Sequence, residues 1–353
     1  MISVNQLAAR FPDMPDVLYA CRFPRWKRPI VRQCFPGRRI VFLAGCDQVP
    51  DSAWLVLWGM ASVPNGTGPQ GRVLRMEDGF MRSAGLGADL VRPVSWVVDG
   101  QGLYYNSAEP SDLESILATG NFDATLCARA AGLRARIVSA GLTKYNVGAD
   151  RWRRPEGAKR VILVPGQVES DASLAYGAPG ERSNMGLLRA VREAHPGAYV
   201  VYKPHPDVLA RLRLEGRGEQ DARQWCDEVV THVDMGQLLT AVDEVHVLTS
   251  LAGFEALLRG KQVTCHGQPF YSGWGLTNDM IPGSRRTRKL TLDELVAGAL
   301  IEYPLYLSRD GKRLITPEEA LESLQAWREQ TGGREPWWRG IYRVFLRKIA
   351  GVR

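Results

Sequence analysis

Two carboxylates directly follow a short apolar run near the middle of the chain. The segment 160–173, RVILVPGQVESDAS, has its apolar run at 161–164, and Glu169 and Asp171 come after the Pro-Gly pair that ends it. A buried parallel strand has this kind of sequence, and ligands of open α/β sheets bind beyond the carboxyl ends of the strands. The segment therefore predicts acids in a ligand crevice, where a carboxylate can act as a nucleophile or transfer a proton.

The segment 198–206, AYVVYKPHP, repeats this pattern with basic side chains. Pro206 suits the first position of a helix, whose N-terminus presents free N–H groups and a partial positive charge to an anion. Lys203 and His205 stand beside that N-terminus, which indicates a phosphate site. The alternative is a rigid turn with a solvent-facing histidine, and the Lys-Pro-His-Pro motif alone does not decide between the two.

The segment 245–253, VHVLTSLAG, places Thr249 and Ser250 between an apolar run and a helix. Their hydroxyls can donate to a phosphate, or one of them can simply cap the helix. Both interpretations can hold, because an N-cap at the carboxyl edge of a strand already faces the crevice. Two anion sites on successive strands indicate a nucleotide or nucleotide-sugar phosphate. The chain has no Walker motif, no complete G-x-G-x-x-G after a strand and no G-x-S-x-G, which disfavours P-loop, dinucleotide-binding and serine-hydrolase chemistry.

A second group of acids follows an apolar run in the N-terminal half. Glu77, Asp78 and Arg82 come directly after the run at 73–76. One carboxylate on each side of a cleft is what a retaining glycosyl transfer can use, as nucleophile and as acid/base. The alternative is a turn in which Glu77 pairs with Arg82 or Arg75, and the spacing alone favours this alternative.

These segments require a scaffold of alternating strands and helices, which implies a parallel sheet with crossover helices. A polar stretch at 148–159 is typical of a linker. We therefore predict an α/β fold of two facing Rossmann-like domains with a cleft between them, at 1–150 and 151–310, followed by C-terminal helices at 311–353. Thr316 is the expected N-cap of a C-terminal helix. The expected strands are 40–44, 54–59, 72–76, 94–98, 161–164, 199–202, 245–248 and 262–265, and the expected helices include 111–117, 122–140, 184–194 and 251–258.

Length and composition are those of a globular protein of two ordinary domains. The chain has 353 residues, 45% of them hydrophobic, and no apolar run approaches the roughly 20 residues that cross a bilayer. The N-terminus lacks the apolar core of a signal peptide. The six cysteines have no CxxC spacing, which disfavours a zinc or disulfide framework and favours a reducing cytoplasm.

The net charge of +7 is concentrated near the two ends of the chain. Seven basic residues and no acid lie between Asp16 and Asp47, and the segment 334–353 holds six basic residues and one acid. This distribution argues against a nucleic-acid binder, whose basic residues would line one continuous face. The aromatic residues within 337–349 can share one face of a helix beside arginines, which suits an anionic membrane surface or, equally, packing on the body of the protein.

Six segments form one ordered set of motifs: RMEDGFMRSAGLGADLVRPVSWVVDGQGLYYNSAEPSDLE, TKYNVGAD, VILVPGQVESDAS, VYKPHPDVL, DEVHVLTSLAGFEALLRGK and GQPFYSGWGLTND. This set resembles the C-terminal module of the KpsC-type capsule Kdo transferases, over residues 44 to 306. The resemblance implies a GT-B architecture and a CMP-Kdo donor. It also implies retaining transfer of β-Kdo to the Kdo linker that joins capsular polysaccharide to a lysophosphatidylglycerol lipid.

The resemblance also implies a role for each candidate residue. The family's Q-x-x-x-D pattern falls on Gln167 to Asp171 and makes Asp171 the nucleophile. Glu77 is then the acid/base, and Arg82 suits the carboxylate of Kdo because a guanidinium binds a carboxylate in bidentate fashion. The other residues expected to bind the donor and its phosphate are Lys203, His205, Pro206, Thr249, Ser250, Gly253 and Glu255. His205 is expected to contribute to catalysis as well, and no metal ion or cofactor is expected to take part.

The expected partners follow from the same resemblance. They are CMP-Kdo, a Kdo-bearing lysophosphatidylglycerol glycolipid and other capsule-assembly proteins, at the cytoplasmic face of the inner membrane, with peripheral contact through the basic ends. The alternative is a non-catalytic module that binds a nucleotide sugar or glycan within a capsule-assembly complex. The presence of every candidate catalytic residue favours the enzyme.

Overall fold

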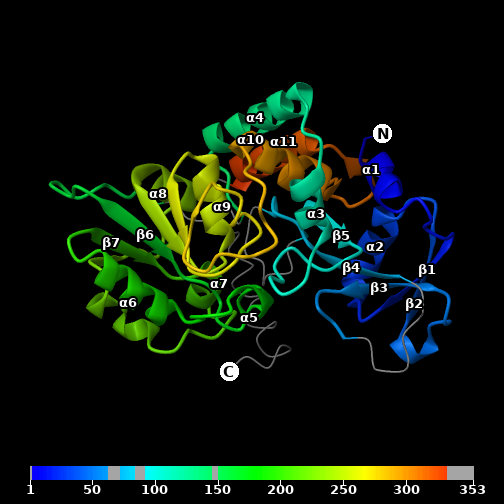
Figure 1. Ribbon diagram of the computed structural model, residues 1–353, viewed down its shortest axis with the longest axis horizontal. Helices are drawn as coiled ribbons and strands as arrows, with labels where there is room; N and C mark the ends of the chain where they lie inside the picture. Colours follow the sequence, from blue (N-terminus) through cyan, green and yellow to red (C-terminus); the bar gives the residue numbers. More distant parts are fainter. Residues whose placement is uncertain (1, 63–71, 84–91, 145–149, 332–353) are drawn as a thin grey trace.

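The structure is a computed structural model that describes residues 2–62, 72–83, 92–144 and 150–331. It confirms a mixed α/β fold, with two sheets that lie side by side (Figure 1). The first sheet has the strand order β13-β12-β5-β4-β3-β1-β2, and the second has the order β11-β10-β9-β6-β7-β8. The strands are β1 (Val17–Cys21), β2 (Arg39–Leu43), β3 (Trp54–Trp58), β4 (Val73–Asp78), β5 (Ser95–Asp99), β6 (Val161–Pro165), β7 (Tyr199–Lys203), β8 (Glu228–Val229), β9 (Glu244–Val247), β10 (Gln262–Cys265), β11 (Asn278–Asp279), β12 (Leu305–Leu307) and β13 (Leu314–Ile315).

The second sheet is parallel throughout, and its strand order reverses at β6. From β6 the chain first adds β7 and β8 on one side and then adds β9, β10 and β11 on the other. Every residue of β6 and β9 is buried, as expected for strands covered on both faces. The carboxyl ends of β6 and β9 are therefore neighbours at the point of reversal, which is where open α/β sheets bind ligands.

The first sheet combines parallel and antiparallel strands. β1 to β4 are parallel, whereas β5 pairs antiparallel with β4 and β12 pairs antiparallel with β5. The chain thus returns to this sheet at Leu305, before the boundary expected at residue 310. β1 was not expected from the sequence, yet it lies inside the sheet between β2 and β3, where Leu18, Ala20 and Cys21 are fully buried.

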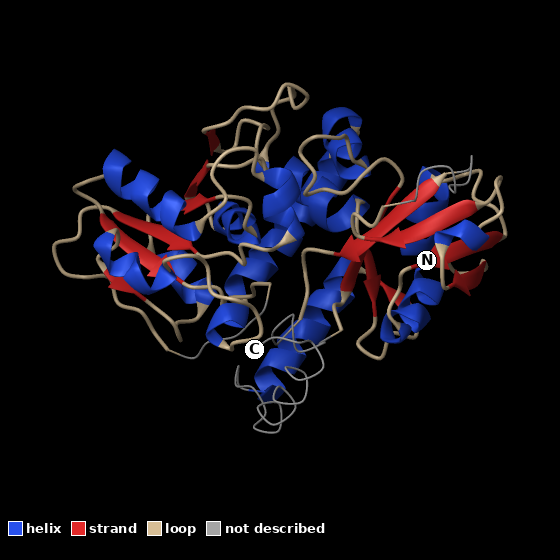
Figure 2. Ribbon diagram, turned by 90° about the horizontal axis from the view of Figure 1, so that it is seen from below, coloured by secondary structure: helices blue, strands red, loops and turns tan. Residues whose placement is uncertain are grey.

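Helices cover both faces of the second sheet and fill the space between the two sheets (Figure 2). Leu187 and Val191 of α6 pack on one face, against Ile162 and Val200. Helices α8 and α9 pack on the opposite face, and α4 contacts α10 and α11 where the two halves meet (Figure 1). The helices are α1 (Ile2–Arg10), α2 (Arg28–Cys34), α3 (Asp112–Thr119), α4 (Ala124–Ser139), α5 (Ala172–Gly177), α6 (Asn184–Ala194), α7 (Pro206–Leu209), α8 (Met235–Ala241), α9 (Leu251–Leu258), α10 (Leu292–Val296) and α11 (Pro317–Thr331).

The capping box predicted at Thr316 is confirmed. Thr316 Oγ1 accepts a hydrogen bond from the Glu319 N–H at 3.2 Å, and Glu319 Oε2 accepts one from the Thr316 N–H at 2.8 Å. The segment 332–353, which holds the predicted basic amphipathic helix, lies outside the described residues. None of the helices within the described ranges has the length and hydropathy of a membrane-spanning segment.

Candidate active site at the ends of β4, β6, β7 and β9

Gln167 connects the two loops that leave β6 and β9. Its Nε2 donates to Thr249 Oγ1 and to Ser173 Oγ, both at 2.8 Å, and its Oε1 accepts from the Thr249 N–H at 3.4 Å. Both Gln167 and Thr249 are buried. These bonds fix the loop that carries Asp171 against the loop that begins α9, so both predicted residues lie at the reversal point of the second sheet.

Asp171 is an exposed carboxylate held by the helix that it begins. It is the N-cap of α5, and its Oδ1 accepts from the Ser173 N–H at 3.0 Å and from Ser173 Oγ at 3.1 Å. Oδ1 accepts both of the hydrogen bonds that the described residues make with this carboxylate, which leaves Oδ2 for a ligand. The anchored and exposed geometry is suitable for a nucleophile.

Glu169 has a structural role instead. Its Oε1 accepts from the Asn184 N–H at 2.8 Å, at the start of α6, and its Oε2 accepts from the Arg217 N–H at 3.2 Å. Both oxygens are therefore engaged by backbone donors. Of the two acids that follow β6, only Asp171 keeps an oxygen available.

Glu77, the penultimate residue of β4, has a carboxyl group whose pKa is raised to about 7, from 4.5. Desolvation is the largest cause of this increase in pKa. The negative charge of Asp78 is the second cause, and the charge of Asp171 contributes as well. Oε1 accepts from the Asp78 N–H at 3.0 Å, and Oε2 accepts from the buried Tyr105 hydroxyl at 3.4 Å. Glu77 therefore lies within electrostatic reach of Asp171, although Glu77 belongs to the first sheet and Asp171 follows β6 of the second.

The ion pairs that the spacing favours for Glu77 do not form. Arg82 donates from Nε and Nη2 to Asp78 Oδ2, at 3.0 and 2.7 Å. Arg75 donates instead to the carbonyl oxygens of Gly59 and Ala61, at 2.8 and 3.1 Å. Neither arginine is the partner of Glu77, so its carboxyl group remains available for proton transfer.

A second cation, Lys27, also lies beside Asp78. Its Nζ is 3.7 Å from Asp78 Oδ1 and 2.7 Å from the centre of the Trp58 ring. Desolvation lowers the pKa of this buried lysine to about 8, against the opposing effect of Asp78. Lys27, Arg82 and Asp78 therefore form a group of two basic side chains and one acidic side chain next to Glu77.

His205 is the N-cap of α7, where Pro206 takes the first helical position as predicted. Its Nδ1 accepts from the Asp207 N–H at 3.1 Å. Desolvation, followed by the positive charge of Lys144, lowers the pKa of His205 to about 3. His205 is therefore neutral at pH 7, and because Nδ1 is the acceptor, Nε2 carries the proton and can donate to an anion. This assignment of the tautomer follows from the hydrogen bond.

Lys203 and Ser250 serve the local structure. Lys203 is buried, its Nζ donates to the Thr231 carbonyl at 3.2 Å, and desolvation lowers its pKa to about 8. Ser250 is the N-cap of α9, because its Oγ accepts from the Ala252 N–H at 3.3 Å. The N-cap interpretation of Ser250 is thus confirmed, and the cap orients the start of α9 beside Thr249.

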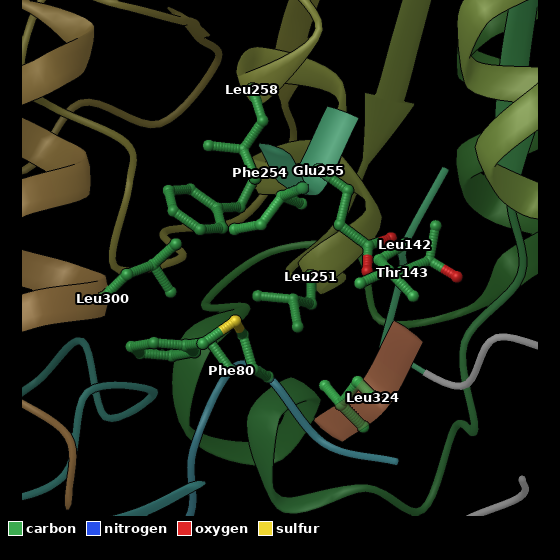
Figure 3. A pocket seen from close by; sticks show the side chains of 11 residues that line it. Phe80, Leu142, Thr143, Leu251, Phe254, Glu255, Leu258, Leu300 and Leu324 are labelled. Atoms are coloured by element: carbon green, nitrogen blue, oxygen red, sulfur yellow. The ribbon is translucent and has the colours of Figure 1, made fainter. Parts of the chain in front are cut away.

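Gly253 and Glu255 lie within α9. A Cβ at Gly253 would lie 2.3 Å from the Tyr271 hydroxyl, which donates to the Ser250 carbonyl, so the glycine leaves room for that contact. Glu255 is buried, and its Oε1 accepts from the Lys144 N–H at 2.5 Å. Desolvation raises the pKa of Glu255 to about 7. The carboxyl group borders an otherwise mainly apolar pocket (Figure 3), lined by Phe80, Met81, Ile137, Leu142, Thr143, Leu251, Phe254, Leu258, Leu300 and Leu324.

Four residues near the site were not selected from the sequence: Lys27, Tyr105, Lys144 and Ser173. Three of them lie within the quoted motifs, which was the available signal: Tyr105 in the first, Lys144 in TKYNVGAD and Ser173 at the end of VILVPGQVESDAS. Lys27 belongs to a basic segment far from the motifs, and only the pairing of the strands brings it to Asp78.

Comparisons with known proteins agree with this arrangement. The family model described as "Capsule polysaccharide biosynthesis protein" matches residues 69–146 and 125–308. The capsule polysaccharide modification protein LipA of Neisseria meningitidis serogroup B is 41% identical over 342 residues, which cover 94% of this chain and 49% of LipA. The lipopolysaccharide-processing protein LpsZ of Rhizobium meliloti is 41% identical over 300 residues, covering 80% of this chain and 68% of LpsZ.

Two solved structures of Thermosulfurimonas dismutans KpsC have the same fold. The beta Kdo 2,7 transferase superposes with a TM-score of 0.73 at 39% identity, covering 88% of this chain and 99% of that one. The beta Kdo 2,4 transferase superposes with a TM-score of 0.75 at 30% identity, covering 87% and 98%. The chain spans about half the length of LipA. These matches identify the chain as a KpsC-like member of the capsule polysaccharide biosynthesis protein family.

Proposed function

We propose that this chain is a retaining β-Kdo glycosyltransferase that transfers Kdo from CMP-Kdo to a Kdo-bearing glycolipid of the capsular linker. The observation that carries the proposal is the electrostatic proximity of an anchored, exposed Asp171, in the loop after β6, to Glu77 of β4, whose pKa is about 7. The similarity to the two KpsC transferases supports the choice of Kdo. The higher identity to the 2,7 transferase than to the 2,4 transferase, 39% against 30%, favours a 2,7 linkage.

The first step of the proposed reaction forms a covalent intermediate. A carboxylate oxygen of Asp171 attacks the anomeric carbon of Kdo, and the bond to the CMP phosphate oxygen breaks with its electron pair. The leaving phosphate gains negative charge, which the Nε2–H of neutral His205 and the amides at the start of α9 stabilise. One well-placed donor of this kind is commonly worth about 3 kcal/mol in the transition state.

The second step transfers Kdo to the acceptor. Glu77 takes the proton of the acceptor hydroxyl as that oxygen attacks the anomeric carbon, and Asp171 leaves with the electron pair of the ester bond. Two inversions give net retention. The charge of Asp171 is one of the causes that raise the pKa of Glu77, and esterification removes that charge. Formation of the intermediate therefore lowers the pKa of Glu77 and prepares it to act as a base.

The remaining predicted residues complete the proposed donor site. The group of Lys27, Arg82 and Asp78 suits the carboxylate of Kdo, with Arg82 as its main partner. Gln167 and Thr249 hold the two loops together around the nucleotide. Because CMP is a good leaving group and protein donors stabilise it, we propose that the transfer uses no metal ion or cofactor.

We further propose that the two sheets belong to two GT-B domains, the first built from residues 1–150 together with β12 and β13, and the second from the residues between 151 and 304. Peripheral binding at the cytoplasmic face of the inner membrane is part of this proposal, since arginines of the basic N-terminal segment are exposed and can attract anionic lipids. They are Arg22, Arg25, Arg32 and Arg39. The glycolipid acceptor and other capsule-assembly proteins would be met at that surface.

Intact-mass spectrometry tests the covalent step. After incubation with CMP-Kdo without acceptor, the chain should gain the mass of one Kdo, and Asp171→Asn should abolish this gain. Glu169→Gln is the matched control, because it changes a neighbouring acid whose oxygens bind only backbone donors. An adduct that survives in Asp171→Asn would exclude Asp171 as the nucleophile. NMR of the product formed on a synthetic Kdo acceptor then gives the anomeric configuration and the linkage, and absence of turnover would favour the non-catalytic module.

A further inference from the structure

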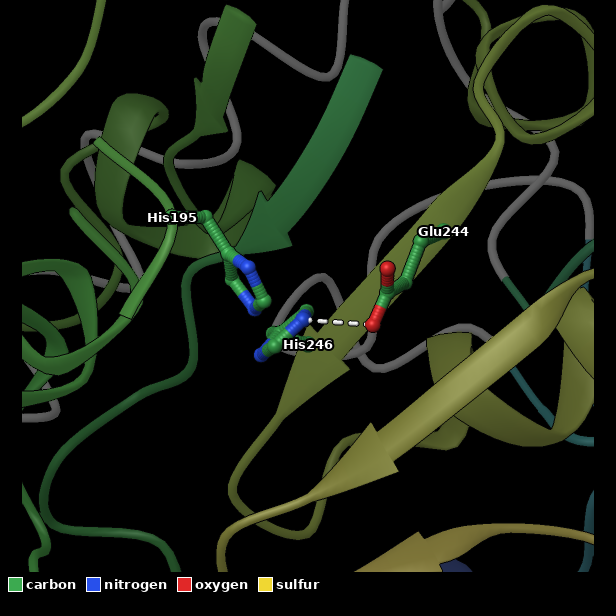
Figure 4. Close-up of side chains that lie close together, drawn as sticks. All are labelled: His195, Glu244 and His246. Carbon is green, nitrogen blue, oxygen red and sulfur yellow. Dashed lines mark hydrogen bonds and ion pairs between the residues drawn. The ribbon is translucent and has the colours of Figure 1, made fainter. Parts of the chain in front are cut away.

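A cluster of histidine and glutamate side chains lies on the second sheet and has no role in the proposed transfer. Glu244 and His246 are two residues apart on β9, so their side chains project from the same face of the sheet. His195 follows α6, and the centre of its ring lies 5.2 Å from that of His246 (Figure 4). One potential ligand atom from each of these three residues lies within 4.8 Å of the other two.

The residues around this cluster orient it. His246 Nε2 lies 2.8 Å from Glu244 Oε1, and Thr264 Oγ1 donates to the same oxygen at 3.0 Å. His246 Nδ1 lies 3.1 Å from His266 Nε2. The other oxygen of Glu244 accepts from Arg160. Both Glu244 and His246 are almost fully buried, so this network holds each of them in one orientation.

We infer that His195, Glu244 and His246 bind one divalent transition-metal ion, with Zn²⁺ the best fit. Two imidazoles and a carboxylate, with water in the fourth position, are a common ligand set for this ion, and magnesium prefers oxygen ligands. His246 can use Nε2 for the metal and donate its Nδ1–H to His266 Nε2. A second hydrogen bond of this type is usual for a metal-bound histidine.

Only a small movement is needed to close the site. Ligand atoms around a tetrahedral Zn²⁺ lie about 3.3 Å apart, given metal–ligand distances of about 2.0 Å. The separations of up to 4.8 Å in the cluster therefore call for a shift of at most about 1.5 Å. His195 can supply it, because it is partly exposed just beyond the end of α6. The bound ion would join α6 to β9, the strand that leads to Thr249. Arg160, which contacts both His195 and Glu244, holds a positive charge nearby and limits the affinity.

Metal titration of the full chain tests this inference. The protein is freed of metal with a chelator and titrated with ZnCl₂ in a calorimeter, and CoCl₂ is used as a spectroscopic probe. We expect one Zn²⁺ per chain with a Kd of about 1–10 µM, visible absorption bands of four-coordinate Co²⁺, and no comparable binding of Mg²⁺. His195→Ala should weaken Zn²⁺ binding at least about tenfold, and His266→Ala should weaken it by about tenfold through loss of the orienting hydrogen bond.

His232→Ala is the matched control, because His232 is exposed and lies outside the cluster. It should leave the Zn²⁺ affinity unchanged. His195 and His266 are both partly exposed, so these variants should fold, and thermal melts of the metal-free proteins verify this. Absence of stoichiometric binding up to about 100 µM Zn²⁺, or equal affinity of wild type and His195→Ala, would overturn the inference. The Kdo-adduct assay tests residues outside this cluster, so neither outcome of the metal titration decides whether the proposed function is right.

Discussion

Removal of the positive charge of Lys27 should change the pH dependence of transfer in a defined direction. Lys27 lowers the pKa of Glu77, opposing the larger effects of desolvation and of Asp78. By Coulomb's law, a full charge at a distance of about 8 Å contributes about 2 kcal/mol at an effective dielectric constant of about 20. Since Asp78 partly neutralises Lys27, we expect Lys27→Met to raise the pKa of Glu77 by about one unit.

The assay is kcat/KM for the acceptor as a function of pH. Glu77 must be ionised to take the acceptor proton, so the rate should fall about tenfold for each pH unit below its pKa. In the wild type the midpoint of this acidic limb should lie between pH 4.5 and about pH 7, because the esterified Asp171 no longer raises the pKa of Glu77. In Lys27→Met the limb should move about one unit toward alkaline pH.

A control separates the charge of Lys27 from its packing. Arg32→Met removes an exposed cation from the same basic segment, one that lies over the Phe42 ring, and should leave the limb in place. A limb that stays fixed in Lys27→Met, or moves toward acid, would refute the electrostatic reasoning. A limb that persists in Glu77→Gln would exclude Glu77 as the base.

Three further results are expected. His205→Ala should weaken CMP binding about 10- to 100-fold, and by the same factor at every pH from 5 to 8, because a pKa of about 3 keeps the imidazole neutral over this range. If calorimetry finds a larger loss of affinity below pH 6, the imidazole acts as a cation instead. Gly253→Ala should lower the free energy of unfolding by about 1–3 kcal/mol, since its Cβ would meet Tyr271; unchanged denaturant stability would contradict this. Glu255→Gln should raise the free energy of unfolding at pH 8 by up to about 3 kcal/mol and by less at pH 5, because a carboxyl group whose pKa is higher in the folded state destabilises the protein as the pH rises from 4.5 to about 7. Equal thermal shifts of the variant at both pH values would argue against this reasoning.

The sequence predicted the strands that carry the site because each has a strong local signal. Continuous apolar runs that end in Pro, Gly or hydroxyl residues placed β6, β7 and β9 to within a residue or two. β1 was missed because its apolar residues stand inside a strongly basic segment, and β8 and β11 have only two residues each. β12 was missed because its partner β5 lies about 200 residues earlier in the chain, and no local pattern reports such a pairing.

The roles of individual side chains were harder to predict than the positions of the strands. The sequence places Glu169 and Asp171 two residues apart, with equal claims to the chemistry. They differ because backbone amides at Asn184 and Arg217, distant in sequence, engage Glu169. Similarly, the pairing of Arg82 with Asp78 rather than with Glu77 depends on how the chain turns after β4.

The return of the chain to the first sheet through β12 affects how the two halves can move. The halves are joined once between α4 and β6 and again just before Leu305. A body held by one connection can swing in any direction, whereas two connections leave rotation about the line through them as the easiest motion. Phe80 of the first half also stacks on Phe270 of the second, with ring centres 4.3 Å apart. We therefore expect any change in the separation between Glu77 and Asp171 to follow this one rotation, and we expect substitutions near residue 304 to alter it without touching either carboxylate.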